Sequence, residues 1–523
     1  MKRSLTMFIN DCLISFAAVT CIKLLFVPLY KSTDFEVHRN WMAITHQKHI
    51  QEWYFEETSQ WTLDYPPLFA WFEYLLSFLA KYFDPKMLQV TNLNYESKQT
   101  VFFMRLSVIL SDLVYCYGVN RIFNLIKEKK GKAHDPWVSA EATLAMLLLW
   151  NPGLLLVDHI HFQYNGFLTG FLFISIADMF EKKYVKAAFW FSILINLKHI
   201  YLYLAPAYFL FLLKNFCFKT NVKSPGENTF LLFNFVKLAS VGILTVLFSF
   251  GPFIYMGQLG QVLSRLFPVK RGLTHSYWAP NVWALYNFLD RALSYLALSL
   301  GFSSEDLRSC STRGLVQECE HIILPSISTK VTLILALMSL MPMCWLVLKR
   351  SGNFKVFLDS IILCAFGSFL FGYHVHEKAI LLIILPLTIS AVIYKEEAQL
   401  YVYLSIVGHF SLFPLLHLEG ETPLKILLLL LHVVYMLSSL SKLHGMKTSI
   451  VNTAEKCHLF GLIALQIFYS FGAKFLGLEK RLPFLPLMLI STYCAVGVLY
   501  AWTKFCYISL KNSSNQFVKT KTR

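Results

Sequence analysis

Charged side chains are scarce in this sequence. Asp, Glu, Lys and Arg occupy 15% of its 523 positions, whereas 56% of the positions are hydrophobic and 16% are aromatic. An average soluble domain carries about 25% charged residues, so the composition excludes an ordinary water-soluble fold. Aromatic rings with one apolar and one polar end suit lipid-facing and interfacial positions. The composition therefore predicts an integral membrane protein.

The sequence also lacks the spacings that mark cysteine-based metal centres and repeat architectures. Nine of its 11 cysteines lie in or beside apolar runs, without CxxC or His-Cys patterns, and are expected to be small core residues. Cys310 and Cys319 share one polar loop, where a disulfide remains open. No internal repeat is visible, so nothing here supports transport by paired inverted repeats.

Acidic residues are fewer than basic ones, with 31 Asp and Glu against 47 Lys and Arg. An excess of this size could indicate nucleic-acid binding, but that function needs clustered basic helices or aromatic-basic modules. Here the basic residues stand in short gaps between apolar runs. They are typical of topology signals, and no nucleic-acid partner is expected.

Apolar runs suited to crossing a bilayer, which needs about 20 residues, occur at fourteen places. They are 8–30, 101–126, 138–157, 166–180, 184–197, 200–213, 230–257, 329–348, 354–372, 379–394, 398–417, 423–441, 457–473 and 484–507. The runs 184–197 and 200–213 are short and could form one long helix. Because lysines flank the pair on both sides, two crossings hinged at Lys198 and His199 are favoured.

The basic gaps predict which loops share a side. With the N-terminus cytosolic, the lysine-rich gaps at 127–137, 181–186, 214–229, 349–355 and 442–456 and the C-terminal tail all fall in the cytosol. The first run is expected to be a retained helix, since it contains Asp11 and Lys23 and precedes no small-residue cleavage site. The sequence predicts one integral membrane domain, 1–523, whose first loop, 31–100, and long loop, 258–328, lie on the opposite side.

Polar side chains crowd the helix ends on that opposite side. Asp34 directly follows the first span and precedes an amphipathic pattern that could lie along the membrane surface, formed by Phe35, His38, Trp41, Met42 and Thr45. Such a carboxylate can face a cavity, although it could equally be an exposed interfacial group. Asp64 precedes Tyr-Pro-Pro, and the favoured interpretation is that it caps a helix beginning at Pro66 or Pro67.

Three further groups contain ligand-type side chains. Asp158, His159 and His161 could bind zinc or manganese, but no further acidic or cysteine pair completes the set, so loop-shaping hydrogen bonds are equally expected. His374, His376, Glu377 and Lys378 lie between two apolar runs, where charged groups must face water or a ligand. Arg265, Lys270 and Arg271 could hold a phosphate or form a solvated face.

Six strings extend across nearly the whole chain in a recognisable order. They are STDFEVHRNW, WTLDYPPLFAWFEY, DHIHFQYNGF, SRLFPVKRGL, YWAPNVWALYN and HVHEKAILL. With them the sequence resembles the eukaryotic dolichyl-phosphate-glucose glucosyltransferases of N-glycan assembly. The chain has STDFEVHRNW where the enzyme that adds the first glucose has GDFEAQRHW. The resemblance is therefore to the enzyme that adds the second glucose, with the first as the alternative.

The resemblance implies an all-α polytopic GT-C fold of about fourteen transmembrane helices with lumenal amphipathic helices. It implies an endoplasmic reticulum membrane protein with cytosolic termini and a lumenal active site. Its partners would be dolichyl-phosphate-glucose, a dolichyl-pyrophosphate-linked oligosaccharide and the lipid bilayer. The metal motif of some GT-C enzymes is not cleanly present, so no metal and no cofactor are expected.

The family's catalytic aspartate corresponds to Asp34, and its donor-phosphate side corresponds to Arg271, His376 and Lys378. Substrate-binding or supporting roles are expected for a second set of residues: Glu36, Asp64, Asp158, His159, Gln163, Arg265 and His374. The competing functions are a polyprenyl-lipid transporter, which should bind its cargo at mid-membrane, and a structural assembly subunit.

Overall fold

Helices account for most of the described chain. The computed structural model describes residues 11–130, 139–220, 228–267, 272–275, 277–301, 321–350, 352–446 and 450–511. Arg271, Lys270 and the pair Cys310 and Cys319 lie outside these residues. The chain packs as two compact units, Met1–Pro268 with Leu418–Lys425, and Val269–His417 with Ile426–Arg523. We call them unit 1 and unit 2. The predicted loop boundaries and the single-domain assignment stay predictions.

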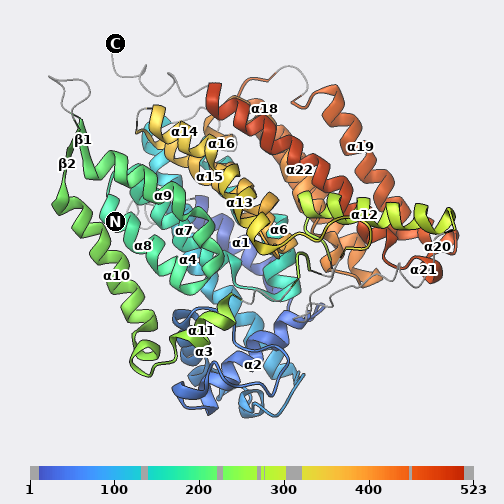
Figure 1. Cartoon of the computed structure of the whole chain (residues 1–523), viewed down its shortest axis with the longest axis horizontal. Coiled ribbons are helices and arrows are strands. Elements are labelled where there is room, and N and C mark those ends of the chain that lie inside the picture. Colours follow the sequence, from blue (N-terminus) through green and yellow to red (C-terminus); the bar gives the residue numbers. More distant parts are fainter. Residues whose placement is uncertain are drawn as a thin grey trace, which may run out of the picture. The chain divides into compact units, whose positions relative to one another are not determined.

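Unit 1 contains the elements up to α11 (Figure 1). They are α1 Asp11–Leu25, α2 Thr33–Gln47, η1 Ile50–Glu52, α3 Pro67–Ala80, η2 Pro85–Leu88, α4 Lys98–Lys130, α5 Ala140–Leu149, α6 Pro152–Leu154, the π-helix η4 Leu155–Phe162, α7 Asn165–Phe180, α8 Tyr184–Leu197, η5 His199–Leu204, α9 Ala205–Leu212, η6 Leu213–Cys217, the antiparallel strands β1 Phe218–Thr220 and β2 Asn228–Phe230, α10 Leu232–Tyr255 and α11 Leu259–Leu266. The short η9 Glu419–Glu421 also belongs to it.

Unit 2 contains the remaining helices. They are α12 Val282–Ser299, α13 Thr329–Ser339, α14 Met341–Lys349, α15 Phe354–Phe371, η7 Glu377–Ile380, α16 Leu381–Ile393, α17 Lys395–Phe410, η8 Phe413–Leu415, most of α18 Thr422–Leu443, α19 Thr453–Ile467, η10 Phe468–Gly472, α20 Ala473–Phe475, α21 Leu478–Arg481 and α22 Leu485–Lys511. Helix α15 is buried from Val356 to Leu370, whereas only Glu455 and Leu462 are buried in α19.

Each of the fourteen predicted apolar runs is mostly helical over its described residues. In the described part of the chain, ten helices are long and apolar enough to cross a membrane. They are Lys98–Glu128, Ala140–Phe162, His199–Cys217, Leu232–Tyr255, Thr329–Lys349, Phe354–Phe371, Lys395–Leu415, Thr422–Leu443, Thr453–Phe475 and Leu485–Lys511. The all-α, polytopic membrane fold is confirmed, and the number of crossings stays a prediction.

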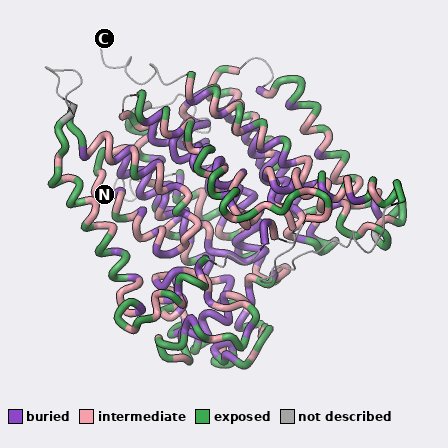
Figure 2. Tube along the Cα trace, viewed as in Figure 1, coloured by how far each residue is buried: buried purple, intermediate pink, exposed green. Residues whose placement is uncertain are grey.

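Burial separates the core helices of unit 1 from its lipid-facing ones. Helix α7 is buried over most of its length, whereas α10 is exposed along most of its length (Figure 2). The exposed side chains of α10 are large and apolar, Phe233, Leu244 and Phe248 among them. Lipid tails are as apolar as these side chains, so contact with lipid costs no free energy. This pattern is therefore typical of a helix that faces lipid.

The helix pair α4 and α7 packs through glycine. A Cβ atom on Gly170 would lie 2.6 Å from the backbone nitrogen of Tyr115, and one on Gly118 would lie 2.7 Å from the carbonyl oxygen of Gly170. Small residues at membrane helix contacts let two backbones approach closely. One turn before Gly170, a Cβ atom on Gly166 would lie 2.4 Å from Oδ1 of Asp112. Glycine therefore sets the α4–α7 distance next to a buried carboxylate.

The stretch that the sequence left open as one helix or two is broken at Lys198. Helix α8 ends at Leu197, Lys198 adopts an extended backbone (φ −149°, ψ 115°), and η5 begins at His199. The hinge predicted at Lys198 and His199 is present. It points the Lys198 side chain back toward the loop that follows η4, where it bonds to Gln163 and Asn165.

The amphipathic pattern of α2 does not lie on a membrane surface, and this prediction is wrong. Phe35, His38, Trp41 and Met42 are 3% exposed or less. They pack into an aromatic cluster with α3 and with Phe162, with His38 5.6 Å from the rings of both Phe69 and Phe162. In Figure 1, α2, α3 and α11 gather at one end of unit 1. Protein, not lipid, covers the apolar face of α2.

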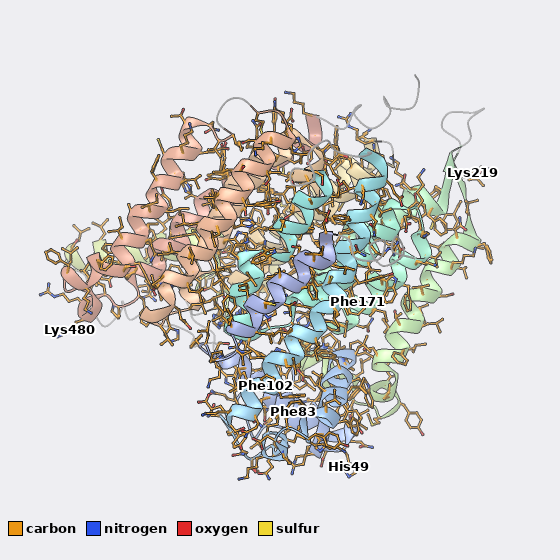
Figure 3. The ribbon with its side chains drawn as sticks, turned by 180° about the vertical axis from the view of Figure 1, so that it is seen from behind. His49, Phe83, Phe102, Phe171, Lys219 and Lys480 are labelled. Atoms are coloured by element: carbon orange, nitrogen blue, oxygen red, sulfur yellow. The ribbon has the colours of Figure 1, made fainter. Side chains whose placement is uncertain are left out.

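This end of unit 1 joins the spanning helices at the start of α4. The ring centres of Phe83, after α3, and Phe102, near the start of α4, are 6.3 Å apart, and Figure 3 labels the two residues close together. His49 and Lys219 are at opposite ends of unit 1 in the same view. His49 of the first loop and Lys219 of a basic gap are thus far apart, and their assignment to opposite membrane sides stays a prediction.

We expect Gly170→Val to lower the melting temperature of the detergent-solubilised protein. The new Cβ would meet backbone atoms of α4 that cannot move aside, and overpacking of this kind destabilises by about 1–3 kcal/mol or more. Gly242→Val is the matched control, because a Cβ there meets nothing within 4 Å. Equal melting temperatures for the two variants would contradict the glycine contact.

Candidate active site

Asp34 stands in the first turn of α2, and two side chains bond to one of its oxygens. Oδ2 of Asp34 accepts hydrogen bonds from Nε2 of His161 at 3.0 Å and from Nε2 of Gln163 at 2.7 Å. The Asp34 side chain is 23% exposed and that of His161 is 11% exposed. The carboxylate is therefore held by two donors while part of it stays accessible.

The unusual backbone between His161 and Gln163 explains how both reach one oxygen. The π-helix η4 ends at Phe162, whose φ of 93° lies in the left-handed region that residues with a side chain rarely adopt. Phe162 turns its own ring into the core, 5.3 Å from the ring of Phe35. π-Helical turns and strained residues concentrate at functional sites. The turn at Phe162 brings its two neighbours to Asp34.

The other two ligand-type residues of this segment serve different partners. Nε2 of His159 lies 2.8 Å from Oδ2 of Asp112, which also binds Lys23 at 2.5 Å. Asp158 accepts hydrogen bonds from the backbone N–H of Gly166 at 2.6 Å and from the Asn165 side chain at 2.9 Å. Asp158 thus caps the first turn of α7. His159 and His161 bind separate carboxylates, so they do not form a common metal site here.

Lys198 completes the polar group around Asp34. Its Nζ donates to Oε1 of Gln163 at 3.3 Å and to Oδ1 of Asn165 at 3.2 Å, and lies 5.0 Å from the ring centre of Tyr65. Desolvation and the charges of Asp64 and Asp34 raise the pKa of the Tyr65 phenol well above its usual range. Tyr65 therefore stays protonated, and Asp34 is the base candidate of this group.

Sequence reasoning undervalued two members of this group. The sequence predicts the supporting role for His159 and at most a metal-ligand role for His161, whereas the structure bonds His161 to Asp34 and His159 to Asp112. Lys198 was recognised as a hinge, and its basic side chain at a helix break between apolar runs was the signal that could have identified it. Gln163 lies where a supporting residue for Asp34 is needed.

Two further predicted supporting residues, Glu36 and Arg265, make structural contacts. Glu36 forms a two-pronged ion pair with Arg39, both bonds at 2.7 Å. Arg265 donates to the carbonyl oxygen of Tyr54 at 3.0 Å and pairs with Glu57 at 2.5 Å. The prediction that Asp64 caps this helix is wrong, because Pro66 is the N-cap of α3. A side chain that does bond at the start of α3 is Ser249, whose Oγ accepts from the backbone N–H of Leu68 at 3.2 Å. Helix α3 does begin at Pro67, as predicted.

In unit 2 the residues at 374–378 join a histidine from the segment before α12. The ring of His275 lies 4.8 Å from that of His376 and 6.0 Å from that of His374. His374 has a φ of 51°, and its Nδ1 lies 3.2 Å from the carbonyl oxygen of Gly272. Lys378 follows in the first turn of η7. Imidazoles and a lysine thus gather at the start of α16.

This cluster could also hold a cation. The ligand atoms of His275, His376 and Glu377 all lie within 4.8 Å of one another, and Glu377 is buried. Two imidazoles and a carboxylate form a set that zinc accepts. The same His376 is the residue that the sequence assigns to the donor phosphate, so metal and phosphate would compete for it.

A family comparison covers nearly the whole chain. Residues 19–505 match the model of the ALG6, ALG8 glycosyltransferase family. The chain belongs to this family. It is therefore a glycosyltransferase, and a polytopic membrane enzyme.

Curated relatives resemble the chain along almost their full length. A mouse protein is 49% identical over 502 residues, covering 95% of each chain. A cattle protein is 47% identical over 497 residues, covering 94% of each chain. One from Arabidopsis thaliana is 42% identical over 507 residues, covering 93% of this chain and 95% of the relative. All three are named dolichyl pyrophosphate Glc1Man9GlcNAc2 alpha-1,3-glucosyltransferase.

Proposed function

We propose that this member of the ALG6, ALG8 family transfers the second glucose of the N-glycan precursor. The donor is dolichyl-phosphate-glucose, the acceptor is the dolichyl-pyrophosphate-linked Glc1Man9GlcNAc2 oligosaccharide, and the new bond is an alpha-1,3 linkage. The observation that carries the proposal is the shared name of the relatives together with 49% identity over 502 residues. The work takes place in the endoplasmic reticulum membrane, with the site on the lumenal side and both termini in the cytosol.

The chemistry assigned to Asp34 is that of a general base. A beta-linked glucosyl phosphate gives an alpha product when the acceptor hydroxyl attacks the anomeric carbon from the face opposite the leaving group. The carboxylate takes the hydroxyl proton as the new C–O bond forms and the C1–O bond to phosphate breaks. His161 and Gln163 support this role, because their bonds to Oδ2 orient the carboxylate.

The leaving group needs positive charge more than it needs an acid. Dolichyl phosphate departs as a stable anion, so cationic side chains aimed at its oxygens can stabilise the developing charge. We assign this role to His376 and Lys378 of unit 2, and to Arg271 on the sequence alone. His374 supports the group through its bond to the 272–273 backbone. With these cations present, the transfer is expected to need no metal.

The alternatives lack comparable support. The curated relatives reported above carry the name of the second glucosyltransferase, and none carries that of the first or of a transporter. A lipid transporter should bind its cargo in broken helices at mid-membrane. The Asp34 group lies instead where the loop after α1 meets the end of η4.

The acceptor experiment tests the substrate assignment. The purified protein, supplied with dolichyl-phosphate-glucose, should glucosylate lipid-linked Glc1Man9GlcNAc2 and leave lipid-linked Man9GlcNAc2 almost untouched. Product oligosaccharides are released and measured by mass spectrometry. Product from Man9GlcNAc2 alone would overturn the assignment in favour of the first glucosyltransferase.

Asp34→Asn should abolish most glucosyl transfer without unfolding the protein. The amide keeps the shape but cannot take a proton, and losing a general base typically costs about 10²–10⁴-fold in rate. Transfer by purified protein and its melting temperature are measured together. Asp84→Asn is the control, because Asp84 caps η2 in the same loop and contacts none of the residues around Asp34. Wild-type transfer by Asp34→Asn would remove Asp34 from the mechanism.

Chelation separates a metal reaction from a cationic one. We expect EDTA to leave the transfer rate of the purified protein unchanged, since side-chain cations neutralise the leaving phosphate. If instead EDTA abolishes transfer and added zinc or manganese restores it in the wild type but not in His275→Ala, the reaction uses a metal held beside His376. That outcome would contradict the metal-independent proposal.

A further inference from the structure

We propose that Arg105 of α4 is a positioning residue for the reaction, which holds the end of the π-helix η4 against the entry to α2 so that His161 and Gln163 reach Asp34. The inference rests on the proposed role of Asp34 and goes beyond it, because the hydrogen bonds of Arg105 go to backbone carbonyls and not to Asp34. Arg105 is a buried cation that neither binds the donor phosphate nor acts as the base in the proposed mechanism, and the inference gives it a role.

The contacts of Arg105 join two segments that are distant in sequence. One terminal nitrogen donates to the carbonyl oxygen of His159 at 2.9 Å. The other donates to the carbonyl oxygen of Ile160 at 2.7 Å and to that of Tyr30 at 2.6 Å. Tyr30 lies just before α2, and the two other carbonyls are at the end of η4. One guanidinium therefore ties the start of the Asp34 helix to the segment that carries His161.

A second contact closes the same junction from the side of α2. The backbone N–H of Ser32 donates to the carbonyl oxygen of His161 at 3.3 Å, and the Ser32 hydroxyl donates to that same oxygen. The Ser32 hydroxyl also accepts from the N–H of Asp34 at 3.2 Å. Arg105 is thus connected to Asp34 by a series of hydrogen bonds that involves the backbone of 159–161 and Ser32.

Arginine suits this task for two physical reasons. The last carbonyls of a helix have no partner within the helix, and leaving them unpaired away from water costs free energy. A guanidinium supplies five N–H donors in a fixed plane and so can serve three carbonyls at once. Arg105 is 2% exposed and lies 5.7 Å from the ring centre of Phe162. Arg105 therefore lies next to the strained residue Phe162 and bonds to the backbone just before it.

A second residue of α4, Asp112, holds the same segment through a different contact. Asp112, two turns further along α4, binds His159 at 2.8 Å and Lys23 of α1 at 2.5 Å. The side chain of His159 is thus fixed by Asp112 while its carbonyl is fixed by Arg105. Helix α4 holds the segment at both its side chain and its backbone, which leaves the Phe162 turn little freedom to relax.

The test compares rates in wild-type and Asp34→Asn backgrounds. Misplacing a reacting group by about 1 Å can cost roughly 10²-fold in rate, so we expect Arg105→Met to lower kcat about 100-fold at little change in KM. Arg105→Lys, which keeps the charge and fewer donors, should lose about tenfold. In the Asp34→Asn enzyme the same Arg105 substitutions should lower the residual transfer hardly at all, because residues that act as a unit are not additive.

Two further variants keep the test decisive. Arg121→Met removes another cation of α4, one that pairs with Asp178 at 2.9 Å far along the helix, and should reduce stability without changing kcat. Ser32→Ala breaks the junction without touching Arg105 and should lower kcat in the same non-additive way. It decides the question even if Arg105→Met does not fold.

The outcomes separate this inference from the proposed function. Wild-type kcat in both Arg105→Lys and Ser32→Ala would overturn the positioning role while leaving Asp34 as the base. Equal losses in the wild-type and Asp34→Asn backgrounds would show that Arg105 acts on folding alone, and would also overturn it. Full transfer by Asp34→Asn itself would instead remove the proposed base.

Discussion

Two hydrogen bonds to a single carboxylate oxygen organise the N-terminal unit. His161 and Gln163 can both reach Oδ2 of Asp34 only because Phe162, between them, takes a backbone conformation that side chains disfavour. Such a conformation persists when its surroundings determine it. The aromatic cluster of α2 and α3 encloses the Phe162 ring, and buried charges of α4 hold the segment before it. The geometry of the polar site therefore depends on the packing of the hydrophobic core around Phe162.

Glycine residues let α4 approach α7 closely enough to hold this site. The α4–α7 contact at Gly118 and Gly170 brings the backbones together, and Gly166 lets Asp112 lie against the start of α7. A side chain at any of these positions would push α4 away from the segment it holds. Charged groups buried among apolar helices are expensive and are found where they pair or act. Lys23 and Asp112 pair with each other at 2.5 Å, which accounts for their presence in apolar runs.

The sequence predicted the coarse architecture well, because apolar runs of bilayer length need no knowledge of their neighbours. All fourteen runs are mostly helical over their described residues, the break falls at Lys198, and α3 begins at Pro67. The site was predicted less completely. The sequence left open whether His159 and His161 bind a common metal or shape a loop, and a π-helix that ends in a left-handed residue sends them to different carboxylates. Local patterns do not indicate such a turn, since the segment is held by distant residues such as Arg105, which bonds to the carbonyl of His159 from 54 residues away.

The same limit explains the two wrong predictions. The pattern of α2 correctly indicated an amphipathic helix, but periodicity cannot say whether its apolar face meets lipid or protein. Asp64 had the type and position of a capping residue, yet Pro66 is the N-cap of α3 and Ser249 bonds to the N–H of Leu68. Both errors concern what a residue touches, which is decided by parts of the chain far away in sequence.

The shortness of α8 has a consequence for the membrane itself. Its 14 residues, Tyr184–Leu197, rise only about 21 Å at 1.5 Å per residue, against a hydrocarbon thickness of roughly 30 Å. A span this short is accommodated by a locally thinner bilayer or by flanking basic side chains that reach to the headgroups. Lys198 follows the last residue of α8 and bonds to Gln163 beside Asp34, so any such adjustment of the lipid at this end of α8 would occur next to the Asp34 group.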